Sequence, residues 1–410
     1  MTFLGILDVY KKMNILFLNN IPFNPTLGGI ERVTDILTKE LLKKGYNIFY
    51  LSGYVDDIRM LNYQFPVTMY TLPEKDFFHS QRNKKYYEEF IQSHQIEIII
   101  NQKGLEANFN ESLRSNLVKK ITVLHSKPNA YLNLYRKVFG AKPNTLKNYL
   151  KNVIKILIFP YIYYRNRKKA LQKLSNQYNY ISDHSDAIIL LSTKYKEEFL
   201  SCNIKRKNIP IYGIHNPNSF SFQPINSWKK EKIILYVGRL KSQIKHPLRL
   251  IKVWEKLYHK HPEWELVFVG EGDAKEEMLK YIEKHNIPNV KLEGQKENVI
   301  TYYQRAQFIC LTSDFEGWGM SLTEGMIFGC IPFTFNCFKA ASDIIDDGEN
   351  GCLIKPYSIT EYATRLDIIM KDKAICEKMS KAAHLKVQNF DIERIVTKWE
   401  TLFKSLKNQA

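Results

Sequence analysis

Short apolar runs alternate with longer amphipathic segments through the first half of the chain. The apolar runs are NILFLNN (14–20), YNIFYLSG (46–53), IEIIINQ (96–102), ITVLHS (121–126) and DAIILLS (186–192). Between the first two runs lies ERVTDILTKELLKKG (31–45), whose apolar positions recur at helical spacing before a terminal glycine. Because the runs themselves do not alternate with polar residues, they predict strands of a parallel sheet covered by helices on both faces. The first half therefore predicts a doubly wound α/β domain.

The alternation stops at HNPNSFSFQPINSWKK (215–230), where Pro, Ser and Asn cluster without periodicity, as they do in a linker. It then restarts and predicts a second doubly wound domain. The strands expected there are KIILYVG (232–238), WELVFVG (264–270), VKLEG (290–294) and QFICLTS (307–313). We place the first domain at residues 13–216 and the second at 217–390. The amphipathic terminal segment 391–410 should cross back to the first domain, and ligands should bind in the cleft between the domains, at the strand C-termini.

Size and composition agree with this division. A chain of 410 residues exceeds what one core usually organises, and 44% hydrophobic residues suffice for two cores. The six cysteines are scattered without a C-x-x-C pair, which favours reduced thiols over a zinc or disulfide framework. Residues 1–12 are too short and weakly apolar for a signal peptide, and no run reaches the roughly 18 apolar residues of a membrane span. We therefore expect a cytoplasmic protein.

The positive charge is concentrated in one window. The formal net charge is +18, and residues 112–182 contain fifteen Lys and Arg but no acidic residue. Within this window VIKILIFPYIYYRNRKK (153–169) mixes bases with Ile, Leu, Phe and Tyr, as membrane-surface segments do, where each cation contributes about 1 kcal/mol. The alternatives are a solvated helix face, or nucleic-acid binding without any recognisable nucleic-acid motif. We expect an anionic membrane surface or lipid-linked substrate, contacted by Arg165, Arg167, Lys168 and Lys169.

The segment SDFEGWGMSLTEGMIFG (313–329) places two carboxylates eight positions apart among glycines. On an unbroken helix this spacing would separate Glu316 from Glu324 by about 12 Å. The glycines instead predict a loop that carries Glu316, followed by a helix that carries Glu324. The two carboxylates can then converge on one ligand.

The start of that helix is a candidate anion site. Its first N–H groups, at Gly319, Met320 and Ser321, and the positive end of the helix dipole would suit a phosphate. An alternative explanation applies to Glu324. Because Ser321 precedes it by three positions, the pair fits a capping box that merely ties down the first helical turn.

Two cations follow a predicted strand in VGRLKSQIKHP (237–247). Arg239 offers a bidentate fork and Lys245 a point charge, and together they suit a pyrophosphate at the edge of the cleft. Taken alone, basic residues in a loop are usually solvent-facing. No G-x-G-x-x-G dinucleotide fingerprint and no G-x-x-x-x-G-K-[ST] phosphate loop occurs in the chain.

The first domain contributes two further candidates. Gly28 and Gly29 precede the first predicted helix and could present backbone N–H groups to an anion, although an ordinary left-handed turn would also explain them. His125 ends the predicted strand at 121–126 and should face the same cleft. A single histidine is more often structural than catalytic.

Together the segments GGIERV, VLHS, VGRL, VGEGD and EGWGMSLTEGMIFGCIP resemble the family 4 retaining glycosyltransferases of the GT-B fold. The last segment matches that family's E-x7-E motif, and the order and spacing of the motifs agree from about Met13 to the C-terminus. DIIDDGENGCLI (343–354) is also similar to members that build bacterial surface polysaccharides and lipopolysaccharide. The resemblance implies two facing Rossmann-like domains with a C-terminal helix that crosses back to the first.

The resemblance also implies roles for the candidate residues. Glu324 would hold the ribose hydroxyls of a nucleoside diphosphate sugar, and Glu316 would contact the donor sugar near its reacting carbon. Arg239 and Lys245 would neutralise the pyrophosphate leaving group. His125 would lie beside the donor sugar, close to the path of the acceptor.

Backbone N–H groups would complete the phosphate site, at Gly29 in the first domain and at Met320 and Ser321 in the second. One departure from the family pattern is a loop after Arg239 that is one residue longer, so Lys241 is an alternative to Lys245. The family works without a metal, and the chain contains no D-x-D motif. We therefore expect no cofactor besides the nucleotide-sugar donor.

These observations predict a membrane-associated glycosyltransferase. It would move a hexose or N-acetylhexosamine from a UDP- or GDP-sugar to a lipid-linked oligosaccharide or polysaccharide precursor, with retention of configuration. A soluble glycogen- or sucrose-type synthase would instead be indifferent to anionic lipid, and a nucleotide-sugar 2-epimerase would need no acceptor. A nucleic-acid-binding protein with a degenerate nucleotide fold would show salt-sensitive binding that ignores nucleotide sugars.

Overall fold

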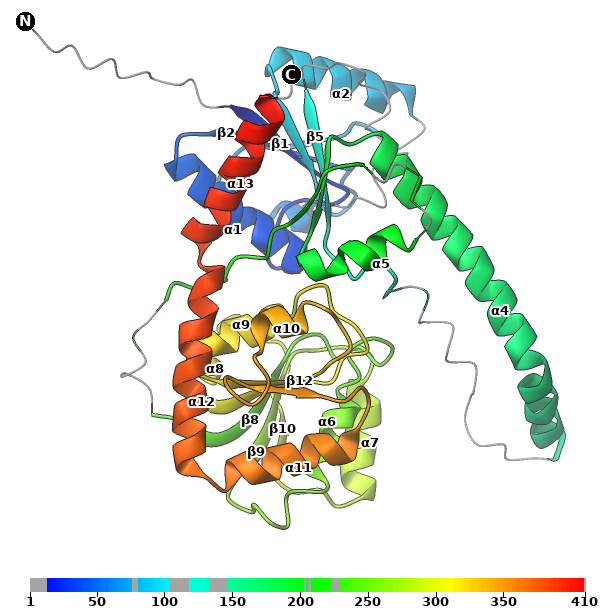
Figure 1. Ribbon diagram of the computed structural model, residues 1–410, viewed down its shortest axis with the longest axis vertical. Coiled ribbons are helices and arrows are strands. Elements are labelled where there is room, and N and C mark those ends of the chain that lie inside the picture. Colours follow the sequence, from blue (N-terminus) through cyan, green and yellow to red (C-terminus); the bar gives the residue numbers. More distant parts are fainter. Residues whose placement is uncertain are drawn as a thin grey trace, which may run out of the picture.

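The structure, a computed structural model, describes residues 13–75, 80–102, 118–130, 132, 146–202, 204–205, 208–222, 224 and 229–408. It divides into two α/β units, and helices α12 (Lys373–Lys386) and α13 (Ile392–Lys407) run along one side of both (Figure 1). Helix α4 (Leu146–Asp183) extends away from the first unit.

The first unit is built on a parallel sheet with the strand order β3-β2-β1-β4-β5-β6-β7. Its strands are β1 (Asn14–Asn19), β2 (Asn47–Ser52), β3 (Met69–Thr71), β4 (Ile98–Asn101), β5 (Lys119–Leu124), β6 (Ala187–Leu190) and β7 (Ile211–Gly213). After β1 the chain adds β2 and β3 on one side of β1, and then β4 to β7 on the other side. The strand order therefore reverses between β1 and β4, which is where open α/β sheets leave a crevice for ligands.

The second unit repeats this construction with the order β10-β9-β8-β11-β12-β13, again all parallel. Its strands are β8 (Glu231–Val237), β9 (Glu265–Val269), β10 (Val290–Leu292), β11 (Ala306–Leu311), β12 (Ile331–Phe335) and β13 (Cys352–Ile354). Here the order reverses between β8 and β11. The loops after these two strands carry the candidate residues of the second domain.

The helices begin and end where local chemistry favours it. In the first unit, α1 (Gly29–Lys43), α2 (Gln81–Ser93) and α5 (Lys196–Leu200) accompany α4, with short 3-10 turns η1 (Ile58–Leu61) and η3 (Thr193–Tyr195). The second unit contains α6 (Leu248–Trp254), α7 (Lys275–Lys284), α8 (Ile300–Arg305), α9 (Met320–Ile327), α10 (Ala341–Ile344) and α11 (Ile359–Met370), and η5 (Val387–Phe390) precedes α13.

The hydroxyl of Ser80 accepts the N–H of Asn83 and caps α2. Helix α1 is followed by Gly45, the glycine at which the sequence predicted its end, and the φ of +83° there is a left-handed C-terminal stop.

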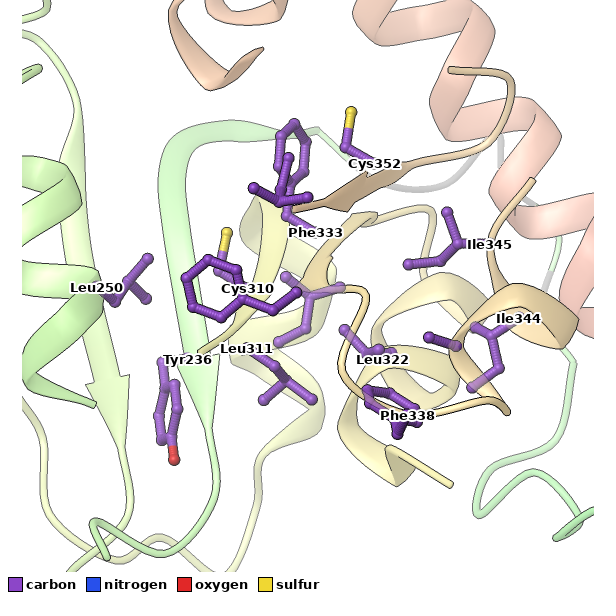
Figure 2. Packing of buried hydrophobic residues seen from close by; sticks show 14 of the residues in the cluster. Tyr236, Leu250, Cys310, Leu311, Leu322, Phe333, Phe338, Ile344, Ile345 and Cys352 are labelled. Carbon is purple, nitrogen blue, oxygen red and sulfur yellow. The ribbon is translucent and has the colours of Figure 1, made fainter. Parts of the chain in front are cut away.

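The strands supply the cores because their side chains are buried on both faces of each sheet. In the second unit, Cys310 and Leu311 of β11 and Phe333 of β12 lie between the helices on either side, and Leu322 of α9 packs against them (Figure 2). Burial of each such apolar side chain contributes about 1.5–3 kcal/mol relative to exposure. This packing explains why the strand segments read as continuous apolar runs.

Helix α13 belongs to the core of the first unit although it follows the second in sequence. Its buried side chains join a cluster with β1, β2 and α1, and the ring of Phe403 contacts that of Tyr46 edge-on at 6.0 Å. The two segments that connect the units, the linker with Asn218 and η5 before α13, are also hydrogen-bonded to each other. The backbone N–H and side-chain amide of Asn218 donate to the carbonyls of Phe390 and Val387, both at 2.9 Å. The predicted fold class, with two doubly wound domains and a returning terminal helix, is confirmed.

Among the described side chains of helix α4, those near its C-terminal end anchor the helix to the first unit. Leu174, Tyr178 and Ile181 are buried, and the Tyr178 hydroxyl donates to the Pro128 carbonyl at 2.8 Å. Closer to the N-terminal end of the helix, the Tyr164 side chain is 66% exposed. None of the helices within the described ranges is both long enough and apolar enough to span a bilayer.

Candidate functional site

The loop after β11 and the loop after β8 meet through an ion pair. The Nζ atom of Lys245 lies 2.5 and 2.7 Å from the two carboxylate oxygens of Glu316, and the Ser313 hydroxyl donates to the same carboxylate at 2.6 Å. The Glu316 side chain is only 10% exposed, so the pair is largely shielded from water. The structure thus brings together the predicted phosphate cation and the predicted sugar-contacting carboxylate. The described side-chain contacts place Lys245, and not the exposed Lys241, on Glu316.

A second set of contacts fixes the loop that carries Lys245. Asp314 accepts hydrogen bonds from His246 at 2.8 Å and from Arg249 at 2.6 Å, and its N–H donates to the Ile244 carbonyl. Burial of Asp314 opposes ionisation, but the hydrogen bonds from His246 and Arg249 outweigh it and lower the pKa of this carboxyl. Asp314 therefore stays charged and holds the β8 loop against the β11 loop.

At Gly317 the loop of the second domain comes close to the backbone of the first domain. A Cβ atom there would lie 1.9 Å from the carbonyl oxygen of His125, which belongs to the first domain, so only glycine fits. The buried Tyr195 hydroxyl, also from the first domain, lies 3.2 Å from the Glu316 carbonyl and 3.1 Å from the Gly317 carbonyl. These contacts set the Glu316 loop directly against the end of β5.

Helix α9 begins one residue after Gly319, whose φ of +97° favours glycine. Gly319 provides no side-chain cap, and Met320 and Ser321 occupy the first two helical positions. The first N–H groups and the positive end of the α9 dipole therefore follow immediately on the loop that carries Glu316.

The capping-box explanation for Glu324 is wrong. No side chain caps α9, and the Glu324 carboxylate instead accepts from Ser219 at 2.7 Å and from Tyr303 at 2.8 Å, and pairs with Arg32 at 3.1 Å. Arg32 lies on α1 of the first domain, so this contact links the two domains. Glu324 is 3% exposed. Its carboxylate is therefore a buried acceptor that receives hydrogen bonds from both domains.

The N-terminus of α1 meets the second domain at Arg239, whose guanidinium donates to the Leu27 carbonyl. Gly28 is the N-cap of α1, and its φ of 178° is extended backbone, so the left-handed turn considered for it is wrong. A Cβ atom at position 28 would lie 2.6 Å from a Glu31 carboxylate oxygen and 3.3 Å from the Arg239 guanidinium, which are the ends of two flexible side chains. Gly29 begins the helix with open space around its Cα.

His125 follows β5 and lies beside Gln102, which follows the neighbouring strand β4. The imidazole Nε2 is 2.6 Å from the Gln102 amide oxygen, which can only accept, so Nε2 carries the proton. Desolvation lowers the pKa of His125 to about 4, so the ring is neutral near pH 7. Its Nδ1 is then a hydrogen-bond acceptor.

The remaining predicted residues lie apart from this site. Arg165, Arg167, Lys168 and Lys169 are exposed on α4, and the Arg165 guanidinium lies 5.8 Å from the centre of the Tyr161 ring. Part of the charged window cannot be compared with the structure, because residues 112–117, 131 and 133–145 lie outside the described residues. No three His, Cys, Asp or Glu side chains of the described part are grouped so as to hold a metal ion.

Sequence reasoning missed the partners of the site residues. The missed residues are Arg32, Gln102, Tyr195, Ser219 and Tyr303. Two had a usable signal, since Gln102 directly follows a predicted strand end and Arg32 lies in the glycine-preceded first helix turn. The other three come from a 3-10 turn, the linker and a short helix, and nothing local in the sequence marks them.

Comparisons with known proteins agree with this arrangement. Residues 218–386 match the family "Glycosyl transferases group 1". The chain is 31% identical over 222 residues to an uncharacterized glycosyltransferase of Haemophilus influenzae, covering 52% of this chain and 60% of that protein. It is 27% identical over 227 residues to a Campylobacter jejuni GalNAc-alpha-(1->4)-GalNAc-alpha-(1->3)-diNAcBac-PP-undecaprenol alpha-1,4-N-acetyl-D-galactosaminyltransferase, covering 54% and 61%. The chain thus matches about three fifths of the length of these relatives.

Solved structures show the same fold over nearly the whole chain. The pneumococcal O-GlcNAc transferase GtfA in complex with UDP and GlcNAc superposes with a TM-score of 0.71 at 12% identity, covering 96% of this chain and 99% of that one. Anabaena HepE in complex with UDP and glucose gives 0.68 at 17% identity, covering 96% and 100%. At these identities the likeness establishes the GT-B fold.

The pairing of His125 with Gln102 predicts a specific change in titration. In Gln102→Glu, a carboxylate at hydrogen-bonding distance should stabilise the imidazolium and raise the pKa of His125 by about 2 pH units. In Gln102→Met, which keeps the side-chain length but has no amide oxygen, the pKa should stay low. Nitrogen-15 NMR of labelled histidines across pH 3–8 measures both. An unchanged His125 titration in Gln102→Glu would contradict the assigned contact.

Proposed function

From the match of residues 218–386 to the glycosyl transferases group 1 family, we propose that the chain is a metal-independent, retaining glycosyltransferase. It transfers a hexose or N-acetylhexosamine from a UDP- or GDP-sugar. The acceptor is a lipid-linked oligosaccharide or polysaccharide precursor at the cytoplasmic face of the cell membrane.

The observation that carries this proposal is the Lys245–Glu316 ion pair at the start of α9. It sets a cation and a carboxylate side by side where the β8 and β11 loops converge, next to a helix N-terminus. In glycosyl transfer, the diphosphate leaves with growing negative charge while the sugar becomes oxocarbenium-like. Lys245 and the α9 N–H groups stabilise the diphosphate, and Arg239 adds a second cation from the β8 loop. Glu316 contacts the donor sugar near its reacting carbon.

His125 takes part as a neutral group. With a pKa lowered to about 4 by desolvation, it is a poor proton donor near pH 7. Its Nε2 is committed to Gln102, so Nδ1 accepts a hydrogen bond from a hydroxyl of the donor sugar or acceptor. Its backbone carbonyl touches Gly317, which places the ring beside the Glu316 loop. The proposed role of His125 is therefore to orient a hydroxyl.

The acceptor assignment draws on two kinds of support. The Campylobacter jejuni relative is named for a diphosphoundecaprenol-linked acceptor, and a Salmonella typhimurium relative, 26% identical over 202 residues, is named a lipopolysaccharide 1,6-galactosyltransferase. In this chain, exposed cations and tyrosines on α4 offer charge and amphipathic rings to an anionic bilayer surface.

The donor site predicts that nucleotide binding depends on Glu324. In Glu324→Ala the ribose hydroxyls lose their acceptor, so the rise in melting temperature caused by UDP or GDP should disappear. Thermal-shift measurements of wild type and variant with each nucleotide test this. The melting temperature without nucleotide serves as the check on folding. Equal stabilisation of both proteins by nucleotide would remove Glu324 from the site.

The membrane assignment predicts that α4 carries liposome binding. Replacing Arg165, Arg167, Lys168 and Lys169 with Gln should release the protein from vesicles rich in phosphatidylglycerol, because these four cations lie exposed on one helix. The matched control replaces four exposed lysines of the second domain, Lys371, Lys373, Lys378 and Lys381, with Gln.

Co-sedimentation with vesicles measures binding, and UDP- or GDP-induced stabilisation should survive in both variants. If the α4 variant and the second-domain variant bind the vesicles equally well, α4 is not the membrane contact.

A further inference from the structure

The carboxylate of Glu324 is nearly saturated with hydrogen bonds from the protein itself. A carboxylate has about four lone-pair positions, two on each oxygen. Oε2 accepts from the Tyr303 hydroxyl at 2.8 Å, while Oε1 accepts from the Ser219 hydroxyl at 2.7 Å and from the Arg32 guanidinium at 3.1 Å. The described residues thus use three of the four positions and leave one open on Oε2.

A ribose diol needs two of these positions. If Glu324 holds the donor's ribose, as the proposed function requires, one of the three protein donors must give up its place when the 2′- and 3′-hydroxyls bind. A 2′-deoxyribose has a single hydroxyl to offer and fits the one open position. The number of hydroxyls on the sugar therefore decides whether a protein contact is broken.

The three donors differ in how readily they can leave. Tyr303 is fully buried, and burial together with the adjacent Glu324 carboxylate raises its pKa well above its ordinary value, so its hydroxyl stays protonated and donates. Ser219 follows Asn218, which is hydrogen-bonded to the carbonyls of Val387 and Phe390. Arg32 is different, because its side chain is 42% exposed and reaches Glu324 from the other domain. Arg32 is therefore the donor whose displacement from Glu324 costs the least free energy.

We infer that Arg32 competes with the donor's ribose for Glu324 and thereby sets how strongly the site prefers a ribonucleotide to a 2′-deoxyribonucleotide. A ribonucleotide gains a second hydrogen bond to Glu324 but breaks the Arg32 ion pair. A 2′-deoxyribonucleotide gains one hydrogen bond and leaves the pair intact. Arg32 therefore narrows the difference in affinity between the two ligands.

Removing Arg32 should widen that difference. In Arg32→Met, which keeps much of the apolar stem but has no donor, the ribose diol meets an Oε1 position that nothing else occupies. The ratio of dissociation constants, 2′-deoxynucleotide over ribonucleotide, should rise about two- to five-fold, the range expected for an ion pair with one exposed partner. Because UDP and 2′-deoxy-UDP carry the same charge, the loss of a cation near the diphosphate cancels in this ratio.

The experiment measures binding of UDP and 2′-deoxy-UDP by calorimetry, or of GDP and 2′-deoxy-GDP if guanine is the base that binds. The matched control is Lys43→Met, which removes an exposed cation from the same helix, α1, where it pairs only weakly with Glu40 at 3.0 Å. Arg32→Lys keeps the charge with a shorter reach and should give a smaller rise in the ratio. Lys43→Met should leave the ratio unchanged.

An unchanged or lower ratio in Arg32→Met overturns the inference when Glu324→Ala has lost nucleotide binding, as the proposed function predicts. If Glu324→Ala keeps wild-type preference, Glu324 does not hold the ribose, and the assignment on which the inference rests is itself wrong. The two failures therefore appear in different variants.

Discussion

The contact between Gly317 and the His125 carbonyl is the constraint on which the rest of the site depends. It brings the loop after β11 in the second domain against the end of β5 in the first, at a distance that no side chain at 317 would allow. Tyr195 reinforces the contact from a 3-10 turn of the first domain. Glu316 is adjacent in sequence, so its carboxylate and the Lys245 cation are held where the two sheets' C-terminal edges face each other. The pairing of the domains therefore positions the Glu316 loop, whereas the Lys245–Glu316 ion pair itself lies within the second domain.

The charged side chains in this region form ion pairs in which a phosphate or a sugar hydroxyl could replace one partner. Lys245 binds Glu316 within the second domain, and Arg32 binds Glu324 across the domains. A buried carboxylate without a partner is costly, so each acid needs a cation or several neutral donors in the protein. A diphosphate and a diol offer replacement partners of the right kind to both pairs. If the proposed donor binds at these pairs, this exchange of partners would couple its binding to the contact between the domains.

The sequence predicted the parts of the structure that are local. Continuous apolar runs located β1, β2 and β4–β6, and the glycines of 313–329 marked the loop before α9 because a left-handed Gly319 and a close approach at Gly317 both require them. The α13 helix was visible from its apolar stripe. Strands β3 and β7 were not predicted, because their three residues are only partly buried and do not form a continuous apolar run.

What the sequence could not predict are contacts made across long separations. Arg32 and Glu324 are 292 positions apart, and Gln102 and His125 are 23 apart on neighbouring strands. The capping box at Ser321 failed for this reason, since the local pattern was present but tertiary donors captured the Glu324 carboxylate instead. Candidate residues could thus be named from motifs, whereas their partners required the folded chain.

The central claim is that Lys245 and the start of α9 stabilise a departing nucleoside diphosphate. The most direct measurement is the release of free UDP or GDP from a panel of UDP- and GDP-linked hexoses and N-acetylhexosamines, with wild type and Lys245→Met compared. Wild type should hydrolyse at least one of these donors, and Lys245→Met should do so about 100-fold more slowly, as expected when a charge-stabilising group is lost. Equal release by both proteins would contradict this claim.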